Sequence, residues 1–154
     1  MRFISSCAFS GCSNLKSIVI PEGIADIGES AFEGCRSLEN VTLPASLKTL
    51  GQHAFGSCTL LESVSFRPGL KALPSMVFSR CETLNHVELP DTLEEIGSEA
   101  FDNCENLLSL QLPRSIGFIE PDAFTECRHL MLFVYPDSYA KEFAEERGLL
   151  FSEI

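Results

Sequence analysis

Hydrophobic residues recur along this chain in columns that stand 23 residues apart. Each repeat begins with a pattern such as Leu15-x-x-Ile18-x-Ile20, whose last part places a column residue at every second position. Alternation with a period of two is typical of a half-buried β-strand. The pattern therefore predicts one short strand near the start of every repeat.

The remainder of each repeat predicts turns. Pro21 and Gly23 end the strand, since proline cannot donate to a ladder and glycine accepts a positive φ. A tight second segment follows, and then a short helical or 3₁₀ turn that carries a small residue and a phenylalanine. The most regular columns are Phe9, Phe32, Phe55, Phe78, Phe101 and Phe124; Cys12, Cys35, Cys58, Cys81, Cys104 and Cys127; and Leu15, Leu38, Leu61, Leu84, Leu107 and Leu130.

A strict period without insertions indicates a solenoid, in which each repeat is one coil that packs on its neighbours. Equivalent strands lie one full turn apart, so their sheet must be parallel. We expect an α/β solenoid of six 23-residue coils over residues 1–136, with a parallel sheet on one face and short helical turns on the other. The third coil has Pro74 where other coils have glycine, and we expect local distortion there.

Residues 137–154 predict a C-terminal cap made of a helix and a strand. Asp137 is suited to be the helix N-cap, Gly148 is suited to end the helix, and 149–151 predict an extended segment. The apolar stripe of this helix consists of Tyr139, Ala140, Phe143 and Ala144. No comparable cap precedes the first coil, and Ile4 already occupies an interior column, so we interpret the chain as a fragment of a longer protein.

The strand alternation assigns Phe133 and Tyr135 of the last coil to the interior, and Leu132 and Val134 to the outer surface. On this assignment the outward strand positions carry small polar groups and lack aromatic platforms, which argues against oligosaccharide stacking. Short polar groups cost little entropy to immobilise, and they suit a protein or peptide partner. The candidate partner-binding residues are Asn40, Thr42, Ser63, Ser65, His86, Glu88, Ser109 and Gln111.

The repeats at 27–44 and 96–113 share the pattern Ile-Gly-x-x-Ala-Phe followed by Cys-x-x-Leu and a strand that ends in Leu-Pro. This pattern resembles the BspA-like, or Treponema-type, class of leucine-rich repeat, and Ser138-Tyr139-Ala140 is similar to the usual ending of that family. The resemblance implies a bacterial surface or secreted protein, with extracellular or cell-surface localisation. It also implies adhesion to a host extracellular protein or another partner protein.

Composition narrows the choice of partners. A formal charge of −11 disfavours nucleic acid and anionic membrane surfaces, because few Lys or Arg residues exist to contact phosphates. No apolar run reaches the roughly 20 residues that cross a bilayer, and no signal peptide is visible. Eight acidic residues and no basic ones lie between Arg80 and Arg114; a solvated surface, a basic partner or a loosely bound cation would each explain this run.

The seven cysteines predict neither a metal site nor a cofactor. The six periodic thiols occupy one column, where parallel side chains suit burial better than bridging, and no Cys-x-x-Cys spacing occurs. We expect these six to be free and buried, and Cys7 to be partly exposed.

Catalysis is also not expected. His86 and Glu88 share the outward side of one strand with Ser63 and Ser109 on the neighbouring strands, but a flat sheet supplies neither a strained elbow nor an oxyanion hole. The interpretation that we favour is a noncatalytic binding module. A structural spacer or intracellular scaffold is the alternative, and the sequence leaves the oligomeric state open.

Overall fold

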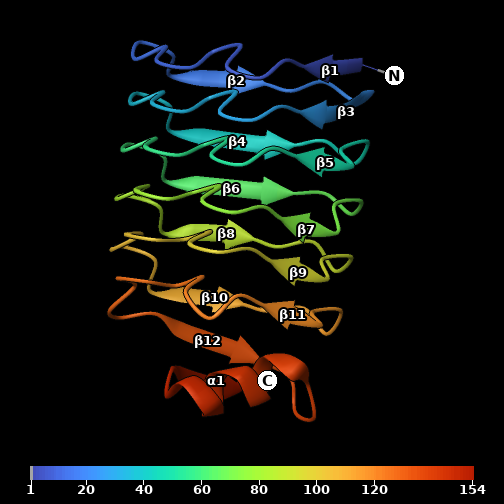
Figure 1. Cartoon of the computed structure of the whole chain (residues 1–154), viewed down its shortest axis with the longest axis vertical. Coiled ribbons are helices and arrows are strands. Elements are labelled where there is room, and N and C mark those ends of the chain that lie inside the picture. The colour runs from blue at the N-terminus through green and yellow to red at the C-terminus, as the bar shows by residue number, and fades with distance from the viewer. Residues whose placement is uncertain (1) are drawn as a thin grey trace.

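The computed structural model describes residues 2–154, and it shows a stack of coils that runs from the first repeat to a single C-terminal helix (Figure 1). Each coil contributes one strand to a first ladder. These strands are β2 (Ser17–Val19), β4 (Asn40–Leu43), β6 (Ser63–Phe66), β8 (His86–Glu88), β10 (Ser109–Gln111) and β12 (Met131–Val134). We call the outward side of these six strands the strand face. The predicted parallel solenoid is confirmed.

The tight second segment of each coil forms a further parallel ladder, which the sequence pattern did not predict. Its strands are β1 (Arg2–Ile4), β3 (Ile24–Ile27), β5 (Thr49–Leu50), β7 (Ala72–Leu73), β9 (Glu95–Ile96) and β11 (Phe118–Ile119). The ladder divides into β1-β3-β5 and β7-β9-β11. The predicted distortion of the third coil is therefore confirmed. Gly51 and Gly97 donate their N–H groups to the preceding coil, and Pro74, at the equivalent position, has no N–H to donate.

The segment with the small residue and the phenylalanine is a series of hydrogen-bonded turns. In the second coil the N–H groups of Ala31, Glu33 and Cys35 each bond to the carbonyl three residues earlier. The turns do not continue as a helix, because Ser30 and Gly34 have φ values of 53° and 71°, in the left-handed region. The same two columns have positive φ in most coils, so the predicted helical turns are chains of turns.

Phenylalanine rings form the axis of the core. The rings of Phe9, Phe32, Phe55, Phe78, Phe101 and Phe124 stack on one another, with centroids 5.1 to 5.9 Å apart. The four rings from Phe32 to Phe101 have no solvent exposure. Equivalent positions of successive coils lie next to one another, so phenylalanines one period apart in the sequence are in contact in the structure.

The cysteine column runs beside these rings. Cys35, Cys58, Cys81 and Cys104 are free and buried, as predicted. The prediction of burial was wrong for Cys12, which is exposed, and for Cys127, which is half-buried. Both lie in end coils, where fewer neighbouring coils cover them.

The cap consists of α1 (Tyr139–Arg147) and β13 (Leu150–Glu153). The predicted N-cap at Asp137 was wrong: Ser138 is the N-cap, and its hydroxyl oxygen accepts the N–H of Lys141. The stop at Gly148 is confirmed by its φ of 65°. The extended segment pairs with β12 in parallel, so the cap extends the first ladder by one strand.

The strand of the last coil is shifted by one residue relative to the sequence pattern. β10 and β12 pair Leu110 with Leu132 and Gln111 with Phe133, a spacing of 22, whereas the pairs among β2, β4, β6 and β8 keep 23. Leu132 and Val134 are fully buried, and Phe133 is half-exposed. The prediction of inward Phe133 and Tyr135 was therefore wrong, because a one-residue shift moves every side chain to the opposite face.

Candidate functional site

The eight predicted binding residues all lie on the strand face. Asn40, Ser63 and His86 are neighbours in register on β4, β6 and β8. Thr42, Ser65 and Glu88 form the adjacent row on the same three strands. Ser109 and Gln111 lie on β10 with exposed side chains. The alternation of buried and exposed residues along each strand directs these side chains away from the core.

The first ladder is interrupted between β8 and β10. Strands β2, β4, β6 and β8 form one sheet, and β10, β12 and β13 form another. A cleft of about 640 Å³ lies at this interruption. Its lining residues are His86, Val87, Glu88, Leu89, Asp91, Ser109, Gln111, Pro113, Arg114, Ser115, Phe133 and Tyr135. Four of the predicted residues therefore line one cleft, and the other four lie on the flat sheet beside it.

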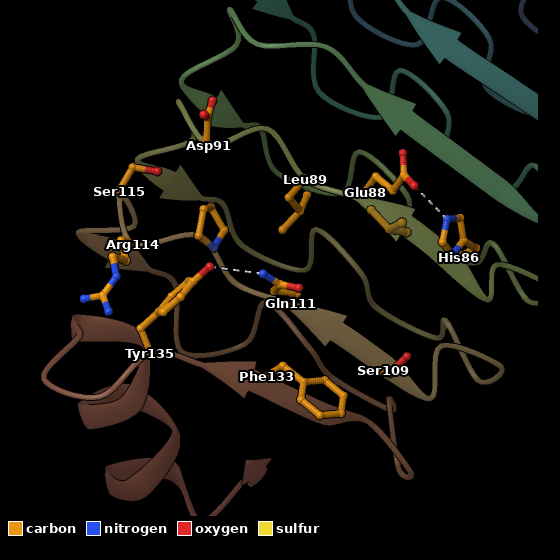
Figure 2. A pocket seen from close by; sticks show the side chains of 12 residues that line it. His86, Glu88, Leu89, Asp91, Ser109, Gln111, Arg114, Ser115, Phe133 and Tyr135 are labelled. Carbon is orange, nitrogen blue, oxygen red and sulfur yellow. Dashed lines mark hydrogen bonds and ion pairs between the residues drawn. The ribbon is translucent and has the colours of Figure 1, made fainter. Parts of the chain in front are cut away.

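Three contacts order the side chains of the cleft (Figure 2). Nε2 of His86 lies 3.3 Å from Oε1 of Glu88, and both groups are largely exposed. On the opposite wall, the amide of Gln111 donates to the hydroxyl oxygen of Tyr135 over 3.3 Å. The guanidinium of Arg114 lies 4.3 Å from the centre of the Tyr135 ring, a cation–π contact. Tyr135 is therefore held both at its hydroxyl and through its ring.

The sequence pattern missed both aromatic residues of the cleft. Phe133 and Tyr135 line it because of the register shift in β12. The predicted absence of aromatic groups from the strand face was therefore wrong. The available signal was the unbroken apolar run from Leu130 to Tyr135, which is compatible with either register.

The polar groups of the strand face are not arranged as a catalytic triad. The hydroxyl of Ser63 donates to Oδ1 of Asn40 over 2.6 Å, and His86 pairs with Glu88 on its own strand. Within residues 2–154, no group of three or more His, Cys, Asp or Glu side chains is arranged to hold a metal ion. No helix in that same range has the length and apolar character that crossing a membrane requires.

This chain is similar to known proteins in sequence and in fold. Residues 2–137 match the model of the BspA type leucine rich repeat region in six copies. A leucine-rich repeat protein of T. pallidum is similar to 85% of this chain, with 32% identity and a TM-score of 0.75. One from Bacteroides ovatus is similar to 99% of the chain, with 26% identity and a TM-score of 0.75.

A third solved structure is described as a leucine rich cell surface protein of Faecalibacterium prausnitzii. It shares 27% identity over 89% of this chain, with a TM-score of 0.63. The chain spans 62% of the T. pallidum protein, 45% of the Bacteroides protein and 43% of the Faecalibacterium protein. No protein with a curated description matches the sequence.

Proposed function

The chain belongs to the BspA-type leucine-rich repeat family, and we propose that it is a noncatalytic module that binds a protein partner through its strand face. Domains with leucine-rich repeats generally mediate protein interactions. We further propose that the module belongs to a bacterial surface or secreted protein and has an adhesive role. The description of the Faecalibacterium relative as a cell surface protein supports this placement.

The observation that carries the proposal is the registered array of outward-facing polar groups on β4, β6 and β8, exposed on β4 and β8 and half-buried on β6. Beneath it, Val41, Val64 and Val87 are buried and anchor the strands to the core. A rigid sheet holds the outward side chains in fixed positions, so little conformational entropy is lost when a partner docks.

The test replaces residues at the centre of the strand face. Ser63→Arg, Ser65→Arg, His86→Glu and Gln111→Arg are expected to abolish capture of a partner from host extracellular proteins. Because these side chains point away from the core, each should change the free energy of unfolding by only about 0.5 kcal/mol. Bound protein can be identified by mass spectrometry, and folding can be checked by circular dichroism.

The matched controls lie beside the second ladder. Lys48, Lys71 and Glu94 are exposed there, and Lys71 pairs with Glu94 over 2.7 Å. Charge reversal at these positions is expected to leave capture unchanged. A partner that is lost only with the control variants would show that the strand face is the wrong site. If neither the unsubstituted protein nor any variant captures a partner, the spacer or scaffold alternative is favoured.

A further inference from the structure

The cleft of the strand face has open main-chain edges. β8 and β10 belong to consecutive coils, yet each is the edge strand of its own sheet. Main-chain hydrogen bonds join the coils on either side of this opening. The N–H of Asn85 donates to the carbonyl oxygen of Glu62, and the N–H of Met131 donates to the carbonyl oxygen of Leu108. β8 and β10 form no ladder pairs with each other. Their facing edges therefore present main-chain carbonyl oxygens and N–H groups to the cleft.

The interior of the cleft is partly apolar. Leu89 lines it and is half-exposed, whereas Leu43 and Leu112, its counterparts in two other coils, are fully buried. Phe133, also half-exposed, lines the same cleft (Figure 2). This surface suits the aliphatic part of a long side chain better than a small polar group.

The charge around the cleft favours a cation. Glu88 and Asp91 are exposed carboxylates in its lining, and among residues 2–154 Asp91 takes part in no ion pair. The segment between Arg80 and Arg114 holds eight acidic residues and no Lys or Arg. A field of one sign attracts a partner of the opposite sign and orients it on approach.

Among the lining residues, all within 2–154, Arg114 is the one Lys or Arg, and His86 is the other basic side chain. The guanidinium of Arg114 is engaged with the face of Tyr135, and Figure 2 shows it at the edge of the cleft, with Leu89 and Gln111 farther inside. Within residues 2–154, the one ion-pair partner of either carboxylate is the imidazole of His86, which lies 3.3 Å from Glu88. The charge of Arg114 nevertheless opposes the entry of a second cation.

We propose that this cleft receives an arginine or lysine side chain of the partner protein. The stem of that side chain packs on the apolar lining at Leu89, and its cationic group meets Asp91 and the open carbonyl edges of the strands. Several acceptors within reach suit a group that carries three to five N–H donors. This inference rests on the proposed function of the strand face, and it names the chemistry of the partner.

The experiment is a titration with N-acetyl-Gly-Arg-Gly-amide at low ionic strength, followed by amide chemical shifts of the labelled protein. Shifts are expected in β8 and β10, and the matching peptides with Gln or Glu in place of Arg should cause none. The double variant Glu88→Gln, Asp91→Asn is expected to weaken binding about fivefold or more. Arg114→Gln is expected to strengthen it, a change that nonspecific loss of structure would not produce.

The control double variant Glu95→Gln, Glu105→Gln removes the same charge from exposed positions outside the cleft, and it should change binding less than about twofold. Shifts spread over the whole acidic surface, or equal weakening by the two double variants, would overturn the inference. Partner capture by the Ser63 and Ser65 variants is measured separately. If those variants lose the partner and the arginine peptide does not bind, only the inference about the cleft fails.

Discussion

The thiol of Cys58 donates a hydrogen bond to the main-chain carbonyl oxygen of Phe32 in the preceding coil, with Sγ and O separated by 3.2 Å. The same carbonyl also accepts the N–H of Cys35. The bond from thiol to phenylalanine carbonyl recurs at Cys35, Cys81, Cys104 and Cys127. The cysteine column therefore fills the core and also gives a main-chain carbonyl of the preceding coil a second hydrogen bond.

The four buried thiols are expected to resist thiol reagents while the protein is folded. Cys7 and Cys12 are exposed and should react at once, and half-buried Cys127 should react at an intermediate rate. Counting modified sites by mass spectrometry, before and after denaturation, measures this order. Bridges between consecutive cysteines of the column in the nonreduced protein would contradict it.

Stability is expected to fall at alkaline pH. Burial raises the pKa of Cys58 from its ordinary value of 9.0 to about 12, and burial also raises the pKa of Cys81. A raised pKa means that the folded state keeps a proton that the unfolded state has lost, so stability is fully present below pH 9 and is lost above it. Cys58 should cost about 1.4 kcal/mol per pH unit between pH 9 and pH 12, and Cys81 should add to the loss above pH 9.

Denaturant unfolding at a series of pH values measures this slope. The double variant Cys58→Ala, Cys81→Ala is expected to be less stable at pH 7 and to show a shallower decline above pH 9. An equal slope in both proteins would mean that other groups cause the alkaline loss.

The stacked rings predict a position-dependent cost. Phe101 is fully buried between Phe78 and Phe124, so Phe101→Ala should destabilise the fold by about 3 to 5 kcal/mol. Phe9 is only half-buried in the first coil, and Phe9→Ala should cost less. Equal losses in denaturant unfolding would contradict the partial exposure of the first coil.

The register of β12 can be tested with two neighbouring residues. Leu132 has no solvent exposure, so Leu132→Ala should cost about 2 to 5 kcal/mol. Phe133 is only half-buried on the strand face, and Phe133→Ser should cost less, about 1 to 2 kcal/mol. The denaturant midpoints of the two variants measure these costs. A lower midpoint for Phe133→Ser than for Leu132→Ala would support the register that the sequence pattern predicted.

A left-handed position offers a stabilising substitution. Arg80 has a φ of 61°, and the equivalent residue Gly34 has a φ of 71°. Arg80→Gly should therefore stabilise the fold by about 1 kcal/mol, because glycine has no Cβ to clash in this region. The control is Glu82→Gly. Glu82 is exposed and does not have a positive φ, so this change should destabilise the fold by a similar amount. The thermal unfolding midpoint should rise for Arg80→Gly and fall for Glu82→Gly.

The period of 23 residues by itself determined the solenoid, the parallel ladder and the inward columns. In a stack of equal coils, residues one period apart occupy equivalent places and lie next to one another, so Phe55 must meet Phe32 and Phe78. The outward direction of Ser63 and His86 follows from the same alternation. Apolar residues flanking them leave one register that buries the strand.

Only the tertiary structure decided the last coil and the cleft. Leu132 with Val134, and Phe133 with Tyr135, are both apolar sets, so the pattern cannot choose which set turns inward. Pairing with β13 and packing beneath α1 bury the smaller set and turn the two rings outward. The opening between β8 and β10 has no local signal either. β10 pairs with β12 along one edge and leaves its other edge unpaired toward β8, an arrangement set by the placement of whole coils rather than by residues within one.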